Sequence, residues 1–423
     1  MKRYESYRPI NISWLEEIPS HWKLVRIKWL LKERTEKSED GQGTPLSMSQ
    51  KMGIVPTSQM DIIPNQASSY VGAKKVNVND LVFNKLKAHL GVFAISHYNG
   101  LVSPDYAVYT PTKITCLPYL EHLFHTQQYI AEFRKKSTGV AIGLTRLYTP
   151  GLFSIHAIYP PLEEQEKIVK FLETKTLIID GYKREREREL RLLEELKQAE
   201  IANAITQGLN PDAPMKPTGI SWLPYIPEHW DRRNLSQVVI EHYKSNNNVH
   251  HQNLLSLSYG RIIQKDINTT DGLLPSSFDG YQIVEPGNII LRLTDLQNDQ
   301  RSLRVGLVTQ EGIITSAYVC LEIVRDILPE YLYYLLHSYD ILKVFYSMGG
   351  GLRQSLNYQG LKKLPIVIPP MNEQERICSF VQSKVNIIDD FIKELQSQID
   401  LLNEYKQRLI ADAVTGQINV QNN

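Results

Sequence analysis

Basic and polar side chains gather in four short segments of this 423-residue chain. Lys and Arg neutralise phosphates at any sequence, whereas Arg, Gln, Asn, Ser and Thr can also pair with the edges of bases. The segments "NKLKAHLG", "FRKKSTG", "LRLTDLQ" and "GGGLRQS" combine both kinds of side chain. We therefore take the following residues as candidate DNA contacts: Lys85, Lys87, His89, Arg134, Lys135, Lys136, Ser137, Thr138, Thr145, Arg146, Arg292, Thr294, Asp295, Arg301, Arg304, Arg353, Gln354 and Ser355.

Motifs that would indicate catalysis are weak in comparison. "YPPL" (159–162) and "IPPM" (368–371) lack the Asp or Asn and the aromatic residue with which amino-methyltransferases hold a target base. Proline in these places instead predicts the end of a strand and the start of a helix. "GGGLRQS" is not a phosphate-binding P-loop, and the scattered histidines do not indicate a metal site. We expect no catalytic residue, no metal and no cofactor in this chain.

An internal duplication spans the whole sequence. "NISWLEEIPSHW" (11–22) is repeated as "GISWLPYIPEHW" (219–230), and "PPLEEQEKIVKFL" (160–172) as "PPMNEQERICSFV" (369–381). "ITQG" at 205–208 corresponds to "VTG" at 414–416, which gives an offset close to 209 throughout. A repeat of this length predicts one structural unit written twice. The segments "NKLKAHLG" and "LRLTDLQ" fall at corresponding places in the two copies, which favours a binding role over a solvated loop.

Each copy begins with a predicted α+β domain. Short apolar runs such as "DLVFNKL", "LGVFAIS", "YAVYT", "GNIILRL" and "AYVCLEI" are typical of strands. Residues 119–133, and 331–345 in the second copy, have the spacing of an amphipathic helix. The Trp and Pro residues of the repeated "SWLxxIPxHW" phrase are expected to pack, and His21 and His229 to be structural.

Each copy ends with a predicted long helix, because residues 163–207 and 371–418 contain no proline. In the second helix Ile388, Ile392, Leu395, Ile399, Leu402 and Leu409 follow the spacing of a coiled-coil seam, and Lys406 fills one place. In the first, Lys183 and Arg186 interrupt the aligned seam. We predict that the two helices pack on each other. A two-fold relation between the copies favours antiparallel packing, and parallel packing is the alternative.

The sequence thus predicts an α+β protein with two pseudo-repeated domains joined by two long helices packed as an antiparallel coiled coil. Its expected ranges are 1–161 for the first domain, 162–210 for the first helical spacer, 211–369 for the second domain and 370–423 for the second spacer.

The bulk composition indicates a globular chain without a membrane segment. Apolar residues make up 42% and charged residues 22%, and the three cysteines lie far apart, which fits a reducing cytoplasm. The net charge is +1, but residues 1–161 carry 19 Lys/Arg against 12 Asp/Glu, whereas residues 211–370 carry 14 against 15. The basic first half is compatible with a polyanionic partner.

Taken together, these segments resemble the specificity (S) subunit of type I restriction–modification systems. The resemblance depends on the paired "SWLxxIPxHW" phrases, on "GLVSPDYAVY" (100–109) and "STGVAIGLTRLYTPGL" (137–152), on the two "PPxxEQE" segments and on the closing "ITQG" and "VTG". It covers essentially the whole chain twice, in the order of the family.

The resemblance implies two target-recognition domains, each recognising one half of a split, asymmetric site in double-stranded DNA. The helices would set the distance between the half-sites and dock two modification subunits, which bring S-adenosylmethionine and methylate adenine N6. Restriction/translocase subunits would bring ATP and Mg²⁺, so that this chain itself would be non-catalytic and act in phage defence.

Two other functions remain as alternatives. A self-contained nuclease or methyltransferase would need a catalytic constellation that the sequence does not provide. A tandem-repeat adaptor that binds only proteins would show no DNA sequence preference in its complex.

Overall fold

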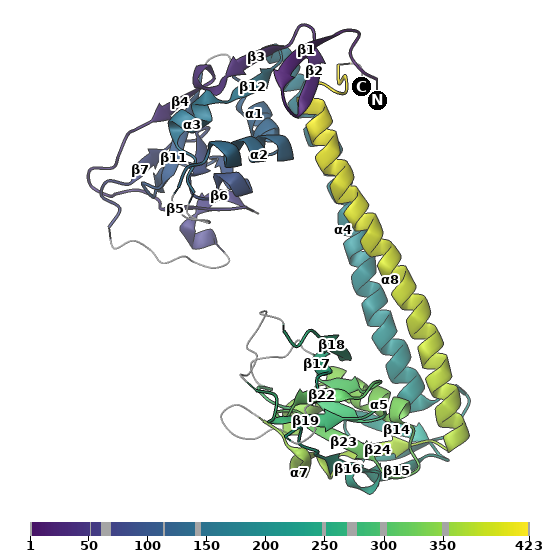
Figure 1. Cartoon of the computed structure of the whole chain (residues 1–423). Helices are drawn as coiled ribbons and strands as arrows, with labels where there is room; N and C mark the ends of the chain where they lie inside the picture. The colour runs from purple at the N-terminus through teal and green to yellow at the C-terminus, as the bar shows by residue number, and fades with distance from the viewer. Residues whose placement is uncertain are drawn as a thin grey trace. The chain divides into compact units, whose positions relative to one another are not determined.

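The duplication in the sequence recurs as two units of the fold. The computed structural model describes residues 2–50, 52–60, 69–112, 115–139, 145–247, 251–268, 277–296, 303–348 and 355–421. Unit 1 comprises residues 1–186 and 397–423, and unit 2 comprises residues 187–396. Each unit holds one predicted α+β domain and part of both long helices, which Figure 1 labels α4 and α8.

Unit 1 is organised around an antiparallel four-stranded sheet in the order β4-β11-β8-β9. These strands are β4 (Leu31–Arg34), β11 (Tyr106–Pro111), β8 (Leu81–Asn84) and β9 (Phe93–Ile95). Paired strands surround the sheet: β1 (Tyr7–Ile12) with β2 (Leu15–Pro19), β3 (Lys23–Arg26) with β12 (His156–Tyr159), β5 (Leu46–Ser49) with β6 (Gly53–Pro56), and β7 (Lys74–Val76) with β10 (Gly100–Val102). The helices are α1 (Leu117–Phe124), α2 (Gln127–Lys136) and α3 (Thr149–Ser154), with the 3₁₀ turn η3 (Ala88–Leu90).

Unit 2 repeats this sheet in the order β16-β23-β20-β21, strand for strand. These strands are β16 (Val239–His242), β23 (Val319–Ile323), β20 (Ile289–Leu291) and β21 (Val305–Leu307). A second four-stranded sheet contains β18 (Arg261–Lys265), β17 (Leu254–Ser258), β22 (Gly312–Thr315) and β19 (Tyr281–Val284). The remaining strands pair as β13 (Met215–Ile220) with β14 (Leu223–Pro227) and β15 (Asp231–Asn234) with β24 (Pro365–Ile368); the helices are α5 (Pro329–Ile341), α6 (Val344–Met348) and α7 (Tyr358–Leu361).

One prediction about the short helices is wrong. Residues 119–133 do not form a single helix, because α1 ends at Phe124 and α2 begins at Gln127. The hydroxyl of Thr126 accepts a hydrogen bond from the Tyr129 amide and so provides the N-cap that restarts the helix. In unit 2 the interruption lies further along, at Lys343, which adopts a φ of 60° between α5 and α6.

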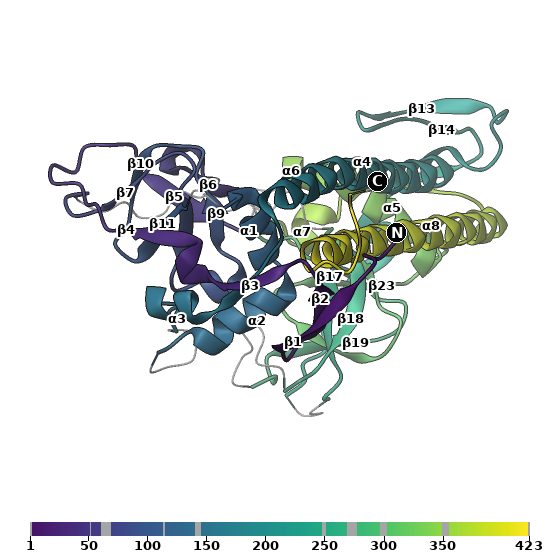
Figure 2. The same ribbon diagram turned by 90° about the horizontal axis from the view of Figure 1, so that it is seen from above.

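The long helices are α4 (Leu162–Gln207) and α8 (Met371–Val414), and they lie side by side in Figures 1 and 2. Asp180 pairs with Lys406 at 2.8 Å in unit 1, and Lys197 pairs with Asp389 in unit 2. Because higher numbers on α4 meet lower numbers on α8, the packing is antiparallel, as predicted. The two ion pairs are also copies of each other, since Asp389 and Lys406 lie 209 positions after Asp180 and Lys197.

Two residues that interrupt the predicted seam, Lys183 and Lys406, bond across the helices. Ile388, Leu395, Ile399 and Leu409 are buried as the apolar spacing requires. Lys406 reaches Asp180, and Lys183 donates a hydrogen bond to the side-chain oxygen of Asn403 at 3.0 Å. These polar pairs specify the helix register more narrowly than apolar contacts alone.

The ends of the repeats complete the cores of the two units. Trp22 and Trp230, from the doubled opening phrase, are almost fully buried. His21 Nε2 lies 2.9 Å from a Glu164 carboxylate oxygen, and His229 Nε2 lies 2.8 Å from one of Glu373. The opening phrase is therefore a packing motif, and in each unit its His pairs with a Glu at the start of a long helix, a contact that the sequence did not predict.

Candidate nucleic-acid interface

In unit 1 the fold brings three separate candidate segments together. The Leu147 amide donates to the Lys85 carbonyl at 2.9 Å, which joins the segment after β8 to the segment before α3. Thr138 and Arg146 exchange two backbone hydrogen bonds of 3.0 and 2.8 Å, which joins the end of α2 to that same segment. The "first cluster" is defined here as Lys85, Ser137, Thr138, Thr145 and Arg146. These residues are partly or fully exposed.

The "SPDY" segment completes the first cluster, although no residue of it was among the predicted contacts. Lys85 Nζ donates to the Pro104 carbonyl at 3.0 Å, and Arg146 lies 3.8 Å from the exposed Asp105 carboxylate. Burial, and then the nearby Lys74 charge, lower the pKa of Lys85. The sequence contained one signal for this segment, which is its place among the stretches that resemble the specificity subunits.

The remaining basic candidates of unit 1 lie beside the first cluster. Arg134, Lys135 and Lys136 are exposed in the last turn of α2, where cations are favourable against the helix dipole. Lys135 pairs with Glu132 at 2.8 Å. Lys87 is exposed and His89 half-buried at η3, which packs against α2.

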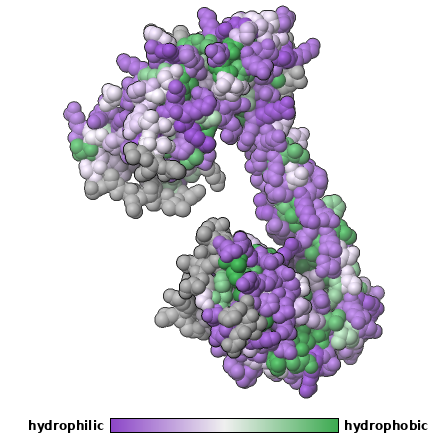
Figure 3. All heavy atoms as spheres, viewed as in Figure 1, coloured by the Kyte–Doolittle hydropathy of each residue, from purple (hydrophilic) through white to green (hydrophobic). Residues whose placement is uncertain are grey.

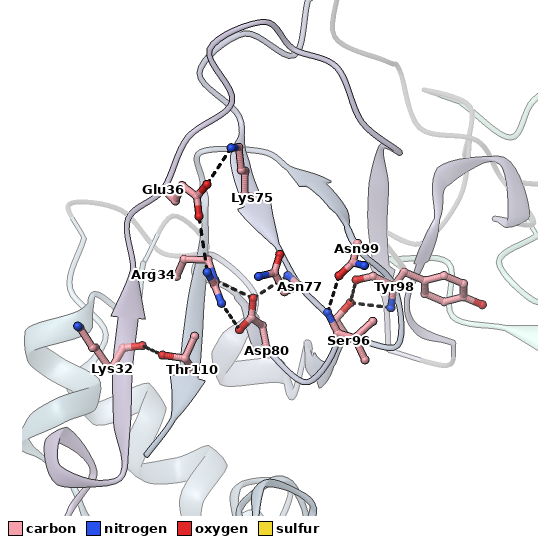
Figure 4. A network of polar contacts seen from close by, with 11 residues as sticks. Lys32, Arg34, Glu36, Lys75, Asn77, Asp80, Ser96, Tyr98, Asn99 and Thr110 are labelled. Atoms are coloured by element: carbon pink, nitrogen blue, oxygen red, sulfur yellow. Dashed lines mark hydrogen bonds and ion pairs between the residues drawn. The ribbon is translucent and has the colours of Figure 1, made fainter. Parts of the chain in front are cut away.

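Other cations of unit 1 are bound within the protein. Arg34 makes a bidentate contact with the buried Asp80 at 2.9 and 3.1 Å, and Asp80 also accepts the Asn77 amide at 2.7 Å (Figure 4). Lys75 pairs with Glu36 at 2.8 Å in the same network. This network ties β4 to the turn before β8, so its cations are structural.

Unit 2 has a corresponding "second cluster", defined here as Arg292, Thr294, Asp295 and Ser355. The Leu356 amide donates to the Leu293 carbonyl at 2.9 Å, which is the counterpart of the bond from Leu147 to Lys85. Arg292, Thr294 and Asp295 are half-buried, and Ser355 is exposed. Three further predicted contacts, Arg301, Arg353 and Gln354, lie outside the described residues.

Arg304 does not have the position expected of a DNA contact. Its exposed fraction is 0%, because the guanidinium is enclosed by the backbone of residues 292–295 and by Tyr346. In this structure the hydrogen-bond donors of the guanidinium bind other groups of the protein. The prediction that Arg304 contacts DNA directly is therefore corrected.

The pair of long helices presents apolar side chains to solvent in unit 1. A hollow of about 380 Å³ is lined by Tyr182 and Arg186 of α4 and by Gln398, Leu401, Leu402 and Tyr405 of α8. Figure 3 shows hydrophobic patches along an otherwise hydrophilic helix surface.

Among the residues that the structure describes, no His, Cys, Asp and Glu side chains group as a metal site would require. Within the same residues, none of the helices has the length and apolar character needed to cross a bilayer.

A buried glutamine at the start of each long helix went unnoticed in the sequence. Gln165 accepts the Cys116 amide at 3.2 Å and donates to the Pro160 carbonyl at 2.8 Å. Gln374 makes the equivalent bonds to Leu328 and Pro369. The "PPxxEQE" segment is thus more than a helix start, since its Gln joins the helix to the globule in both units.

Comparison with known proteins finds similar chains. Residues 305–401 match the family described as type I restriction modification DNA specificity domain. The chain is 19% identical over 437 residues to the type I restriction enzyme MjaX specificity subunit of Methanocaldococcus jannaschii, covering 96% of this chain and 95% of that protein.

Two solved structures share the fold over almost the full length. One, from work on complex assembly and conformational transition of the type I R-M system, has a TM-score of 0.68 at 15% identity and covers 95% of this chain and 99% of that one. The HsdS subunit from Thermoanaerobacter tengcongensis has a TM-score of 0.51 at 15% identity, covering 95% and 98%. Over almost its full length the chain is thus similar to a type I restriction enzyme specificity subunit and shares the fold of these two solved structures, and its residues 305–401 match the DNA specificity domain of type I restriction–modification systems.

Proposed function

We propose that this chain is the non-catalytic subunit that gives a type I restriction–modification complex its DNA sequence specificity. Each recognition domain, 1–161 and 211–369, recognises one half of a bipartite site. The observation that carries this proposal is the matched bond from Leu147 to Lys85 and from Leu356 to Leu293. This matched bond supports the view that the two units have a loop at the same place in the fold and that the loop carries different side chains in each unit.

The difference between the clusters favours an asymmetric target. The first cluster and the end of α2 are rich in cations, which suit phosphates and guanine edges. The second cluster combines Arg292 with Thr294, Asp295 and Ser355, so that it offers acceptors as well as donors. Two sites of different chemistry are expected to recognise two different half-site sequences.

The helical spacers, 162–210 and 370–423, would hold the half-sites at a fixed distance and dock two modification subunits. The apolar hollow lined by Tyr182, Leu401 and Tyr405 supports a protein contact on this surface. In this arrangement the modification subunits bring S-adenosylmethionine for methylation of adenine N6. Restriction/translocase subunits bring ATP and Mg²⁺ in a cytoplasmic complex that defends the cell against phage.

Methylome sequencing of cells that express the complete system tests the proposal directly. We expect one bipartite adenine motif with two different halves. Absence of such a motif from a complex that methylates DNA would contradict the proposal and favour an adaptor that binds only proteins. Methylation by the purified chain alone would instead favour a self-contained enzyme.

A domain exchange tests the division of labour within the chain. Replacing residues 30–155 by the matching segment of another specificity subunit is expected to change one half of the methylated motif and leave the other. Inserting one helical turn near residues 205–212 is the matched control, because it should change the spacing and leave both half-site sequences intact. A second half-site altered by the first exchange would refute modular recognition.

A further inference from the structure

Arg304 is a buried cation whose contacts converge on the polypeptide of the second cluster. Nη1 donates to the carbonyls of Arg292 and Thr294 at 3.0 and 2.9 Å, and Nη2 donates to that of Asp295 at 3.3 Å. Nε donates to the Tyr346 hydroxyl at 3.0 Å. One side chain thus holds three carbonyls of one short segment and joins that segment to α6.

The segment that Arg304 holds is an irregular one. It leaves β20 at Leu291, and Asp295 adopts a φ of 56°, which is the left-handed region that non-glycine residues seldom occupy. Leu293 and Leu296 are buried, while Arg292, Thr294 and Asp295 are half-buried. The polar side chains of the second cluster therefore depend on a backbone that regular secondary structure does not fix.

A guanidinium suits this task better than any other cation. Its planar array of five donors can serve several carbonyls at once, whereas an ammonium group is a point charge with less directional donors. A buried cation is costly unless it is well hydrogen-bonded and lies near a negative charge. The buried Asp340 carboxylate accepts a hydrogen bond from the main-chain amide of Arg304 at 2.6 Å, so an acidic side chain also holds the backbone of this residue.

Unit 1 shows that the fold does not itself require an arginine here. The Arg292 amide donates to the Arg304 carbonyl, and in unit 1 the Asn84 amide donates to the Val92 carbonyl, so Val92 holds the place of Arg304. Unit 1 stabilises its loop locally, because the Asn84 side chain accepts the Leu86 and Lys87 amides at 3.1 and 3.2 Å. The connection in unit 2 is longer, 293–303 against 85–91.

We infer that Arg304 is the positioning residue of the second recognition domain. It fixes the backbone of residues 292–295, so that the side chains of the second cluster meet one half-site in a single geometry. It acts through that loop and does not touch DNA itself. This inference rests on the proposed function, and it predicts a defect confined to one half of the target.

The test uses the complete complex of this chain with its modification subunits and DNA duplexes carrying the methylome motif. Dissociation constants are compared for the intact motif, for a duplex altered in the half-site assigned to unit 2, and for one altered in the other half-site. Arg304→Lys should lower discrimination at the unit 2 half-site by about tenfold, which is the effect of one lost base contact. Discrimination at the other half-site and the affinity for unrelated DNA should stay within about twofold, because phosphate contacts supply non-specific binding.

Two matched variants separate positioning from general damage. Arg325→Lys alters an exposed arginine of the same unit and should change neither ratio. Tyr346→Phe removes the partner of Nε and should lower the same ratio as Arg304→Lys by a smaller factor. Should Arg304→Lys prevent assembly, Tyr346→Phe decides the question alone.

Each outcome has a definite meaning. Unchanged discrimination at the unit 2 half-site in a folded variant would overturn the inference, and so would an equal loss at both half-sites. If the unaltered complex distinguished neither half-site, the proposed function would be the one to fail.

Discussion

Each repeat ends in a glycine, and replacing that glycine by alanine measures how closely the end of the repeat packs against the opening phrase. Gly416 has a φ of 75°, and a Cβ built there would lie 2.5 Å from Pro19 Cδ, 2.7 Å from Pro19 Cγ and 3.0 Å from Trp22. Because the proline ring is rigid and the tryptophan is buried, neither side chain can move away from a new methyl group without a cost in free energy. Gly416→Ala should therefore cost about 1–2 kcal/mol for the left-handed backbone and about 1–3 kcal/mol more for overpacking.

Gly72→Ala provides the control for the backbone contribution. Gly72 has nearly the same φ, 77°, but a Cβ there would meet no described heavy atom within 4 Å. The entropy that alanine removes from the unfolded chain is the same in both variants, so their difference isolates the clash with Pro19 and Trp22. Gly208→Ala should fall between the two, because its nearest neighbours, on Glu373 and Trp230, lie at 3.2 Å.

Urea unfolding followed by tryptophan fluorescence measures the difference, since Trp22 lies at the altered site. With a slope of about 3 kcal/mol per molar urea, Gly416→Ala should lower the midpoint of the unit 1 transition by about 1 M. Gly72→Ala should lower it by about 0.3 M on the same slope. Equal shifts for these two variants would refute the packing of the repeat ends.

Three further predictions concern charges. Asp389→Asn removes the partner of both Lys197 and Arg261 and should destabilise unit 2 by about 1 kcal/mol, an effect that high salt should weaken; an unchanged urea midpoint would contradict it. Burial, and then the Lys197 charge, lower the pKa of His337 to about 4, so the unfolded chain takes up a proton first as the pH falls below about 6.5. The free energy of unfolding of unit 2 should therefore fall by about 2 kcal/mol between pH 7 and pH 5, and the loss should be complete only below about pH 4. Measurements of unfolding at several pH values should show this loss for the unaltered chain and not for His337→Gln. Lys136→Ala in the exposed last turn of α2 should reduce the slope of log K against log salt by about 1 and leave sequence preference unchanged; an unaltered slope would exclude a phosphate contact there.

The repeat made most of the fold predictable from the sequence. Two copies of one pattern gave independent readings of the same strands and helices, and the apolar spacing from Ile388 to Leu409 predicted the buried face of α8. The split between α1 and α2 was missed because the apolar spacing continues across it, and only the capping hydroxyl of Thr126 marks the break. Apolar periodicity carries no information about a local hydrogen bond of this kind.

The candidate site was less predictable, because residue type does not determine exposure. Arg292 and Arg304 look alike in the sequence as basic residues flanking one loop, yet Arg292 is half-buried and Arg304 is fully enclosed. Arg304 is enclosed because the loop that follows β20 turns its carbonyls toward the guanidinium, at residues 292, 294 and 295. Asp105 was not among the predicted contacts, because it lies outside the basic and polar segments from which the candidates were taken, and only the fold brings its carboxylate to within 3.8 Å of Arg146.

The composition of unit 1 has a consequence for the order of folding during synthesis. Unit 2 is one continuous stretch, residues 187–396, whereas the core of unit 1 includes Leu409, Ala413 and Val414 from the far end of the chain. Contacts of such high sequence separation form slowly, and these cannot form before the ribosome has made the last turns of α8. The N-terminal globule, although translated first, therefore matures last. Until then the surface around Pro19 and Trp22 lacks the contacts that Gly416 makes with it in the finished chain.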